Sequence, residues 1–341
     1  MTTTDTAPSA QLIDWLEAEA VTFGLTPESL VRASADAGFR QYWRIQSGPS
    51  QSMIVMDASR ETPESFAAFI KVERLMAEAG VRVPKIYRFS QEARYMLLED
   101  LGHDTALSVV NEDNARAIFE KAIESLILWQ KYSHPGVLPA YDREVLLREL
   151  NLFPEWYVRR HRGHEWSETE SKWWQMSVEA ILDNVLAQPQ VFVHRDFMLR
   201  NLMLLGDGTL GVLDFQDALY GPLSYDIASL MRDAFISWNE SFVLDMTIRY
   251  WERARKAAIP VPADFSDFYR DVEFMGAQRH LKVLGIFARL NYRDAKAKYL
   301  ADTPRFIDYV RKTSQRYIAL SPLSHLIDNL EGSQTQVGYT F

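Results

Sequence analysis

The sequence lacks several features that mark particular classes of protein. None of its 341 residues is cysteine, which excludes disulfides, thiolate metal sites and a cysteine nucleophile. No stretch approaches about 18 uncharged apolar residues, so we expect no membrane span. Residues 1–11 contain no Lys or Arg and precede no long apolar run, so they do not have the layout of a secretory signal. We therefore expect residues 1–11 to form a mobile tail and the protein to be cytoplasmic.

An excess of basic residues is also absent. The chain has 46 Asp and Glu against 37 Lys and Arg, which gives a formal net charge of −9. This balance argues against a general nucleic-acid-binding protein, whose affinity depends on neutralising phosphates. The Walker pattern G-x-x-x-x-G-K-[ST] is missing as well. Apolar residues make up 47% of the chain and charged residues 24%, proportions typical of a folded, enzyme-sized globular protein.

The patterns that are present predict two lobes of different character. Residues 1–102 are predicted to form a β-rich N-terminal lobe, and residues 103–341 a mainly helical C-terminal lobe. In the first lobe, strand patterns cover 34–46, 52–57, 83–89 and 95–99, and helical patterns cover 12–19 and 66–79. In the second lobe, helical periodicity covers 115–130, 143–160, 171–187, 225–236, 242–257 and 265–290. The predicted fold class is therefore α+β.

One β interruption, residues 201–217, lies in the middle of the helical lobe. Asp207-Gly208 is a preferred pair for a two-residue type I′ turn, and a turn centred there pairs residues whose numbers sum to 415. Asn201 and Asp214 satisfy that sum, so we expect them to face each other at the open end of the hairpin. Asp196 lies in the loop just before Asn201. Three oxygen-bearing side chains are thus predicted to converge.

This arrangement suits phosphoryl transfer. Mg²⁺ prefers hard oxygen ligands and needs only one or two from the protein when phosphate oxygens supply others, and Asn201 and Asp214 are the candidates. The carboxylate of Asp196 would accept or orient the proton of the attacking hydroxyl. The alternative is an ordinary polar loop before a hairpin. The His-Arg-Asp of residues 194–196, with an Asn five residues after the Asp, favours the catalytic interpretation.

These motifs resemble the aminoglycoside phosphotransferase and choline kinase superfamily, and the resemblance extends over nearly the whole chain. It implies a two-lobed protein-kinase-like fold that uses ATP and Mg²⁺. Residues 221–228, Gly-Pro-Leu-Ser-Tyr-Asp-Ile-Ala, are similar to an element whose Asp supports the catalytic loop, which assigns that role to Asp226, although Pro222 sits one place early. His194 and Asp217 are expected to support the site in a similar indirect way. The alternative for Asp226 is an acid stabilised by a helix dipole.

Two further segments, 149–157 and 278–287, are most similar to the anomeric amino-sugar kinases of cell-wall recycling, which act on N-acetylmuramate and N-acetylglucosamine. This resemblance implies transfer of the ATP γ-phosphoryl group to the anomeric hydroxyl, giving a sugar 1-phosphate. The lactyl carboxylate of N-acetylmuramate would need a cation. On the predicted helix 265–290 we expect Arg279, with His280 beside it, to bind the sugar; the alternative is a solvated helix face.

The nucleotide side departs from the superfamily pattern. Strand 52–57 lacks the Lys that in related kinases binds the nucleotide phosphates and pairs with a helix Glu. Glu73 matches that Glu, without its usual partner. Arg44 is the candidate to supply the missing positive charge. The predicted nucleotide loop has the single glycine Gly38, where protein kinases often have G-x-G-x-x-G.

Residues 95–102 resemble the hinge that binds adenine through backbone groups, which would be those of Glu99 and Leu101. The alternative is a plain strand that ends at a glycine turn. Gln216, where protein kinases often have the Gly of D-F-G, argues against regulation by an activation loop.

Two rival functions remain open from the sequence. One is phosphorylation of another small hydroxyl compound, such as an aminoglycoside, choline or thiamine. The other is a non-catalytic nucleotide-binding relative, suggested by the missing Lys, although Asp196, Asn201 and Asp214 are all present. The only partner expected is a small-molecule amino sugar, with no nucleic acid and no membrane. A monomer is compatible with the sequence, which leaves the oligomeric state open.

Overall fold

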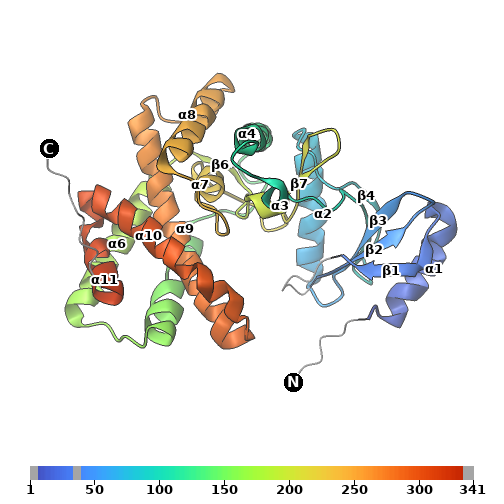
Figure 1. The fold of residues 1–341 in the computed structure, drawn as a ribbon, viewed down its shortest axis with the longest axis horizontal. Coiled ribbons are helices and arrows are strands. Elements are labelled where there is room, and N and C mark those ends of the chain that lie inside the picture. Colours follow the sequence, from blue (N-terminus) through green and yellow to red (C-terminus); the bar gives the residue numbers. More distant parts are fainter. Residues whose placement is uncertain (1–6, 34–39, 333–341) are drawn as a thin grey trace. The chain divides into compact units, whose positions relative to one another are not determined.

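The computed structural model describes residues 7–33 and 40–332. The chain divides into two compact units (Figure 1). The first comprises residues 1–109 and 201–217, and the second comprises residues 110–200 and 218–341. The first unit therefore extends beyond the expected boundary at residue 102, and it includes the hairpin that the sequence analysis assigned to the helical lobe.

The first unit contains a five-stranded antiparallel sheet, in the order β1-β2-β3-β5-β4, and a separate two-stranded hairpin. The strands predicted over 52–57 and 95–99 are confirmed with the same bounds. The strands of this unit are β1 (Thr26–Arg32), β2 (Gln41–Gln46), β3 (Ser52–Asp57), β4 (Ile86–Ser90), β5 (Tyr95–Glu99), β7 (Leu202–Leu204) and β8 (Leu210–Val212). Its helices are α1 (Ala10–Phe23), α2 (Pro63–Glu78) and α3 (Ala106–Val109).

The two faces of the sheet differ in character because side chains alternate along a strand. On β2, Trp43 and Ile45 are buried in one core cluster with Leu12 of α1, which covers this face (Figure 1). Tyr42 and Arg44 alternate with them and therefore belong to the opposite face.

The start of the chain differs from the sequence prediction. Helix α1 begins at Ala10, and the side chain of Ser9 accepts a hydrogen bond from the N–H of Leu12, so the expected tail is too long. Strand β1 was not predicted. It contains Pro27 and is an edge strand, where proline is tolerated. Residues 34–39, which include Gly38 and part of the first predicted strand, lie outside the described residues.

The hairpin of β7 and β8 is closed by a three-residue loop and not by the expected two-residue turn. The N–H of Gly208 donates to the carbonyl of Leu205 at 2.8 Å, and Gly208 has a φ of 80°, the left-handed conformation that such a loop requires after a tight turn. Strand partners consequently sum to 414, as in Leu202 with Val212. The predicted register is wrong by one residue.

Backbone hydrogen bonds explain why the hairpin belongs to the first unit. The N–H of Leu204 donates to the carbonyl of Asp104 at 2.8 Å, and the N–H of Val212 donates to that of Arg82 at 2.7 Å. These bonds join the hairpin to the segments that surround β4 and β5, although the chain enters the hairpin from the second unit.

The second unit is mainly helical, which with the first unit confirms the predicted α+β class. Its short strands β6 (Gln190–Val193) and β9 (Leu219–Pro222) pair antiparallel. Its α-helices are α4 (Ala115–Lys131), α5 (Arg143–Leu150), α6 (Glu168–Ala187), α7 (Tyr225–Met231), α8 (Glu240–Lys256), α9 (Phe265–Asp294), α10 (Thr303–Arg316) and α11 (Ser321–Glu331). A π-helix, η1 (Phe153–His161), and three 3-10 turns, η2 (Leu199–Asn201), η3 (Ala297–Asp302) and η4 (Ile318–Leu320), complete the elements.

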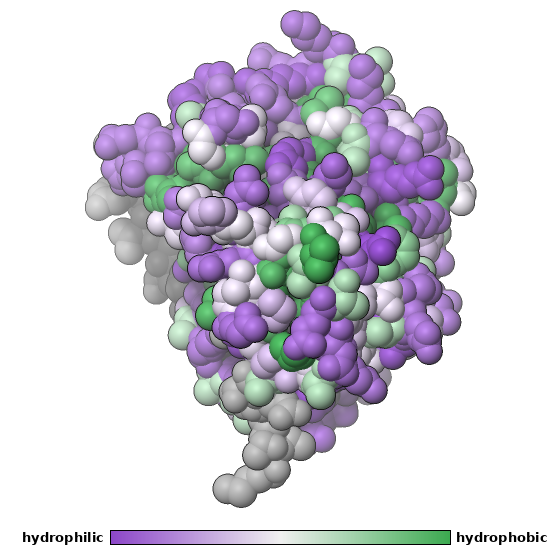
Figure 2. Space-filling model, turned by 90° about the vertical axis from the view of Figure 1, so that its right-hand side faces the viewer, coloured by the Kyte–Doolittle hydropathy of each residue, from purple (hydrophilic) through white to green (hydrophobic). Residues whose placement is uncertain are grey.

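Helix α9 is the central helix of the second unit. Every residue from Val272 to Gly285 is buried, so this stretch is covered on all sides. Helices α10 and α11 were not predicted; α10 packs against α9, and α11 packs against α10 and α6. No helix in the described residues is long and apolar enough to cross a membrane. On the face shown in Figure 2, hydrophobic side chains lie in small groups among hydrophilic ones.

Candidate active site

The predicted catalytic loop begins where strand β6 ends, at Val193. The carboxylate of Asp226, in the first turn of α7, accepts the N–H of His194 at 2.7 Å and that of Arg195 at 3.0 Å. Asp226 is fully buried, and burial raises its pKa to about 7 although both N–H groups act to lower it. One buried carboxylate therefore fixes the backbone immediately before Asp196.

A second buried carboxylate, which the sequence analysis missed, holds the same loop further along. Asp233 accepts the N–H of Leu199 at 3.1 Å. Burial raises the pKa of Asp226 and of Asp233, and the charge of Arg279 acts to lower both. Arg279, predicted at the sugar, is 2% exposed, and its charge acts on both of these acids.

His280, the other predicted sugar ligand, is enclosed by aromatic rings. Its ring centroid lies 4.9 Å from that of Tyr309 and 5.6 Å from that of Phe306. Burial holds the pKa of His280 well below its ordinary value, so the imidazole is neutral. Its position within the fully buried stretch of α9 argues against contact with a sugar, as it does for Arg279.

Arg195 connects the loop to a buried charged cluster. It is one of five non-glycine residues with positive φ in the described part of the chain, at 78°. Its guanidinium donates to Glu149 at 2.6 Å, the ammonium of Lys282 lies 3.1 Å from the same oxygen, and Tyr141 donates to the other oxygen. Burial would raise the pKa of Glu149, but Lys282 and Arg195 hold it down at about 2. Asp196 acts electrostatically on Arg195 and Lys282, so the cluster borders Asp196.

The two segments that carry the amino-sugar kinase resemblance pack against each other beside this cluster. The side chain of Gln278 donates to Glu149 at 3.2 Å. A Cβ atom at Gly285 would come within 2.4 Å of the carbonyl carbon of Leu152, so only glycine allows this approach of α9 to the start of η1. Segments 149–157 and 278–287 thus form one structural feature.

The hairpin brings the predicted metal ligands together in the first unit. The Nδ2 of Asn201 lies 3.4 Å from the Oδ2 of Asp214, and the Nε2 of Gln216 donates to the Oδ1 of Asp214 at 2.9 Å. In the shifted register, the N–H of Leu213 donates to the carbonyl of Asn201 at 2.9 Å. Asp214 has a φ of 62°, so the chain leaves the extended conformation there, and its carboxylate still reaches Asn201.

The donor set of Asn201 and Asp214 fits a magnesium ion. It offers one carboxylate and one amide oxygen, since an amide assigned through its nitrogen can equally present its oxygen. No group of three or more His, Cys, Asp or Glu able to hold a metal occurs in the residues that the structure describes. A cation at this place would therefore rely on phosphate and water oxygens as well. Asp217, expected in a supporting role, is exposed three residues after Asp214.

Arg44, the predicted replacement for the missing Lys, is paired with an acid of the predicted hinge. Its Nε and Nη2 donate to the two oxygens of Asp100 at 2.5 and 2.9 Å, and Nη2 also donates to the carbonyl of Gly102 at 2.8 Å. Ser52 donates to the same carboxylate at 2.6 Å. Asp100, Gly102 and His103 thus hold the guanidinium of Arg44 at the hinge.

The predicted hinge leaves backbone groups available. The side chain of Glu99 is held by Arg82 through two hydrogen bonds of 2.5 and 2.8 Å. Among the described residues no hydrogen bond involves the backbone of Leu101, whose side chain packs on Gly211 of β8. The N–H and carbonyl of Leu101 are therefore free to bind a ligand.

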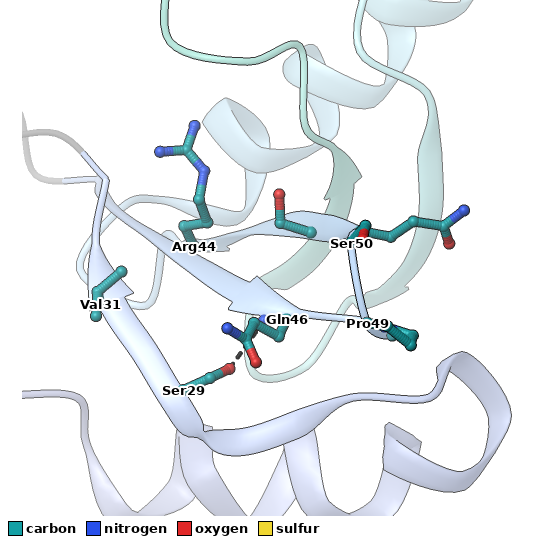
Figure 3. A pocket seen from close by; sticks show the side chains of 9 residues that line it. Ser29, Val31, Arg44, Gln46, Pro49 and Ser50 are labelled. Carbon is teal, nitrogen blue, oxygen red and sulfur yellow. Dashed lines mark hydrogen bonds between the residues drawn. The ribbon is translucent and has the colours of Figure 1, made fainter.

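A pocket with a volume of about 340 Å³ adjoins Arg44 (Figure 3). The dashed line in Figure 3 marks the hydrogen bond of 2.8 Å that the N–H of Gln46 donates to Ser29. Its volume is at the lower end of the range of ligand pockets, about 300–1,000 Å³, and most of its side chains are polar. These lining residues are Ser29, Val31, Arg44, Gln46, Gly48, Pro49, Ser50, Gln51 and Ser52.

Glu73 of α2 matches the Glu that pairs with the strand Lys in related kinases, but that Lys is missing here. Glu73 is half-buried, and burial raises its pKa. No cation in the described residues pairs with it, in agreement with the absence of Lys from β3.

Comparison with known proteins decides the family. A family model described as the phosphotransferase enzyme family matches residues 29–261, more than half of the chain. The chain belongs to this family. This phosphotransferase is 49% identical over 317 residues to a protein of Neisseria meningitidis serogroup B named N-acetylmuramate/N-acetylglucosamine kinase, covering 92% of the chain and 94% of the relative. It is 48% identical over 304 residues to a Pseudomonas aeruginosa protein of the same name, covering 89% of each.

Solved structures of kinases share the fold of this phosphotransferase. One is the amicoumacin kinase hAmiN in complex with AMP-PNP, Ca²⁺ and Ami, with a TM-score of 0.61 and 15% identity over 90% of this chain and 94% of that one. The predicted protein-kinase-like fold is thereby confirmed.

Proposed function

We propose that this phosphotransferase is an ATP-dependent kinase that phosphorylates the anomeric 1-hydroxyl of N-acetylmuramate and N-acetylglucosamine in peptidoglycan recycling. The observation that carries the proposal is the identity of 49% and 48% to two kinases that bear the names of these sugars. The contact between segments 149–157 and 278–287 supports it further, since these are the segments that resemble amino-sugar kinases.

Asp196 is the proposed catalytic residue of the second unit. Its carboxylate would accept the proton of the sugar 1-hydroxyl as that oxygen bonds to the γ-phosphorus, while the bond from the γ-phosphorus to the β,γ-bridging oxygen breaks and ADP leaves. Asp226 and Asp233 would keep its loop in place through three backbone N–H groups, and Arg195 would anchor the loop to Glu149. Arg279 is assigned to these carboxylates and no longer to the sugar, and His280 to the packing of α9.

Asn201 and Asp214 are the proposed ligands of Mg²⁺ in the first unit. The bound ion would neutralise charge on the nucleotide phosphates. The N–H and carbonyl of Leu101, with the carbonyl of Glu99, are proposed to bind adenine, on the face of the sheet opposite α1. The presence of AMP-PNP and Ca²⁺ in the amicoumacin kinase, which has the same fold, is consistent with nucleotide and divalent cation in these places.

The test is ³¹P NMR of the full-length protein with Mg-ATP and, in separate samples, N-acetylmuramate, N-acetylglucosamine, kanamycin and choline. We expect a sugar 1-phosphate signal with the two amino sugars, and we expect Asp196→Asn to reduce its rate of formation by at least about 100-fold. Phosphorylation of kanamycin or choline alone would contradict the sugar assignment. Binding of ATP without transfer to any acceptor would favour a non-catalytic relative.

A further inference from the structure

A second arginine on the nucleotide face of the sheet has no assigned role. Arg40 lies immediately before β2, two residues before Tyr42, and is only 9% exposed. Side chains two residues apart in extended chain share a face, so Arg40 belongs with Tyr42 and Arg44 on the side opposite α1. Unlike Arg44, it does not contact the hinge.

The guanidinium of Arg40 lies along one row of helix α2. Its Nη2 donates to the hydroxyl of Ser65 at 3.2 Å, and its central carbon lies 5.5 Å from the ring centroid of Phe69. Ser65, Phe69 and Glu73 follow one another at four-residue spacing, so they form a single row on the helix surface. Arg40 therefore faces the row of α2 that carries the helix Glu. Arg40 forms an ion pair with Glu61, which lies just before the helix. The Nε of Arg40 is 2.9 Å from the Oε2 of Glu61.

Two chains of contacts connect Arg40 to the segment that begins at Asp214. The ring of Phe69, over which the guanidinium lies, packs on Phe215 with centroids 4.8 Å apart. Tyr42 is close enough to both Arg40 and Asp214 for their charges to act on its pKa in opposite directions. The cation thus lies between α2 and a proposed metal ligand, the region that the strand Lys serves in related kinases.

We propose that Arg40 is the cation that binds the nucleotide phosphates in place of the missing strand Lys, with Glu61 as the acid that anchors it. The proposal rests on the use of ATP in the proposed function. A guanidinium has five N–H donors in a planar fork, so it can keep Glu61 and Ser65 and still donate to a phosphate oxygen. The ordinary alternative is a buried ion pair that only ties the start of β2 to α2.

Phosphate binding by Arg40 and a purely structural role of Arg40 predict different effects on the binding of ATP and of adenosine. A phosphate ligand contributes to binding of ATP and not of adenosine, whereas a structural anchor affects both alike. The measurement is isothermal titration calorimetry of the full-length protein with Mg-ATP and with adenosine. We expect Arg40→Gln to weaken Mg-ATP binding by about 10-fold to 100-fold, the usual contribution of a hydrogen bond to a charged group, and to leave adenosine binding within about twofold. Arg40→Lys should recover part of the loss.

Two control variants separate this effect from a general one. Arg74→Gln removes an exposed arginine of the same helix α2 and should change neither affinity. Arg44→Gln should weaken Mg-ATP and adenosine by the same factor, because Arg44 supports the hinge.

Equal loss of both ligands in Arg40→Gln, or a selective loss of Mg-ATP in Arg44→Gln, would overturn the proposal. If Arg40→Gln does not fold, as judged by circular dichroism, Arg40→Lys carries the test: it keeps the charge but loses the planar fork, so we expect a partial loss of Mg-ATP affinity alone, and a loss of Mg-ATP and adenosine by the same factor would reject the proposal. A wild-type protein that does not prefer Mg-ATP over adenosine would overturn this proposal and the use of ATP together. If Arg40→Gln selectively weakens Mg-ATP binding but the protein phosphorylates no amino sugar, the result would support phosphate binding by Arg40. It would contradict only the proposed acceptor.

Discussion

Glu149 forms ion pairs with two cations, Arg195 and the buried Lys282. Its pKa in the folded protein is about 2, against an ordinary 4.5, so ionised Glu149 stabilises the fold above about pH 4.5 and this contribution is lost as the pH falls through about 2. We expect Glu149→Gln to lower the free energy of unfolding at pH 7 by about 3 kcal/mol, measured by urea denaturation. The difference from the wild type should narrow as the pH falls from about 5 to about 2.

A matched control for this prediction is Glu112→Gln. Glu112 is exposed, and removing its charge should change the free energy of unfolding by less than about 0.5 kcal/mol at any pH in this range. A deficit in Glu149→Gln that stays constant down to about pH 2 would show that the ionised carboxylate is not what stabilises the cluster.

Gly211 decides how closely the hairpin approaches the hinge. A Cβ atom there would lie 2.4 Å from the Cδ1 of Leu101, so any side chain must displace Leu101. We expect Gly211→Ala to lower the free energy of unfolding by about 1–3 kcal/mol through overpacking and to weaken Mg-ATP and adenosine alike, since the side chain of Leu101 at the hinge must change its conformation. Thermal unfolding and calorimetric titration measure the two effects. Gly206→Ala, in the loop of the same hairpin with no atom within 4 Å, should be silent, and equal effects of both variants would refute the explanation.

The elements that the sequence predicted well are those with strong periodic signals, such as the strand 95–99 and the long helix that became α9. The hairpin register failed because Gly206-Asp207-Gly208 suits both a two-residue and a three-residue loop. In the structure Asp207 accepts the N–H of Thr209 at 2.9 Å, a local bond that favours the longer loop.

The residue types and spacing of the catalytic segment were readable from the sequence, and what each side chain touches was not. Arg44 and Arg40 are both arginines near one strand, and only side-chain contacts show that the first pairs with Asp100 and the second with Glu61. Arg279 fitted a cationic stripe on a helix, but the packing of other helices around α9 buries every face of it, and periodicity along one helix contains no information about that packing.

The path of the chain through the whole molecule leads to a final prediction. The chain leaves the second unit after Arg200, forms the hairpin within the first unit, and returns at Ala218. The proposed catalytic residue and the proposed metal ligands therefore belong to different units, although Asp196 and Asn201 are five residues apart. The hairpin is tied to the first unit by its bonds to Asp104 and Arg82.

Local unfolding should follow these bonds and not the order of the sequence. In hydrogen exchange followed by mass spectrometry at low denaturant concentrations, we expect peptides from 201–217 to open with the same free energy as peptides from β4 and β5. The flanking strands β6 and β9 pair with each other, so their peptides should share a different opening free energy. Gly211→Ala should lower the opening free energy of 201–217 and of β5 together and leave β6 and β9 unchanged. If peptides from 201–217 instead shared the opening free energy of β6 and β9, the hairpin would unfold with the helical unit. Gly211→Ala would then have to affect the catalytic loop as well.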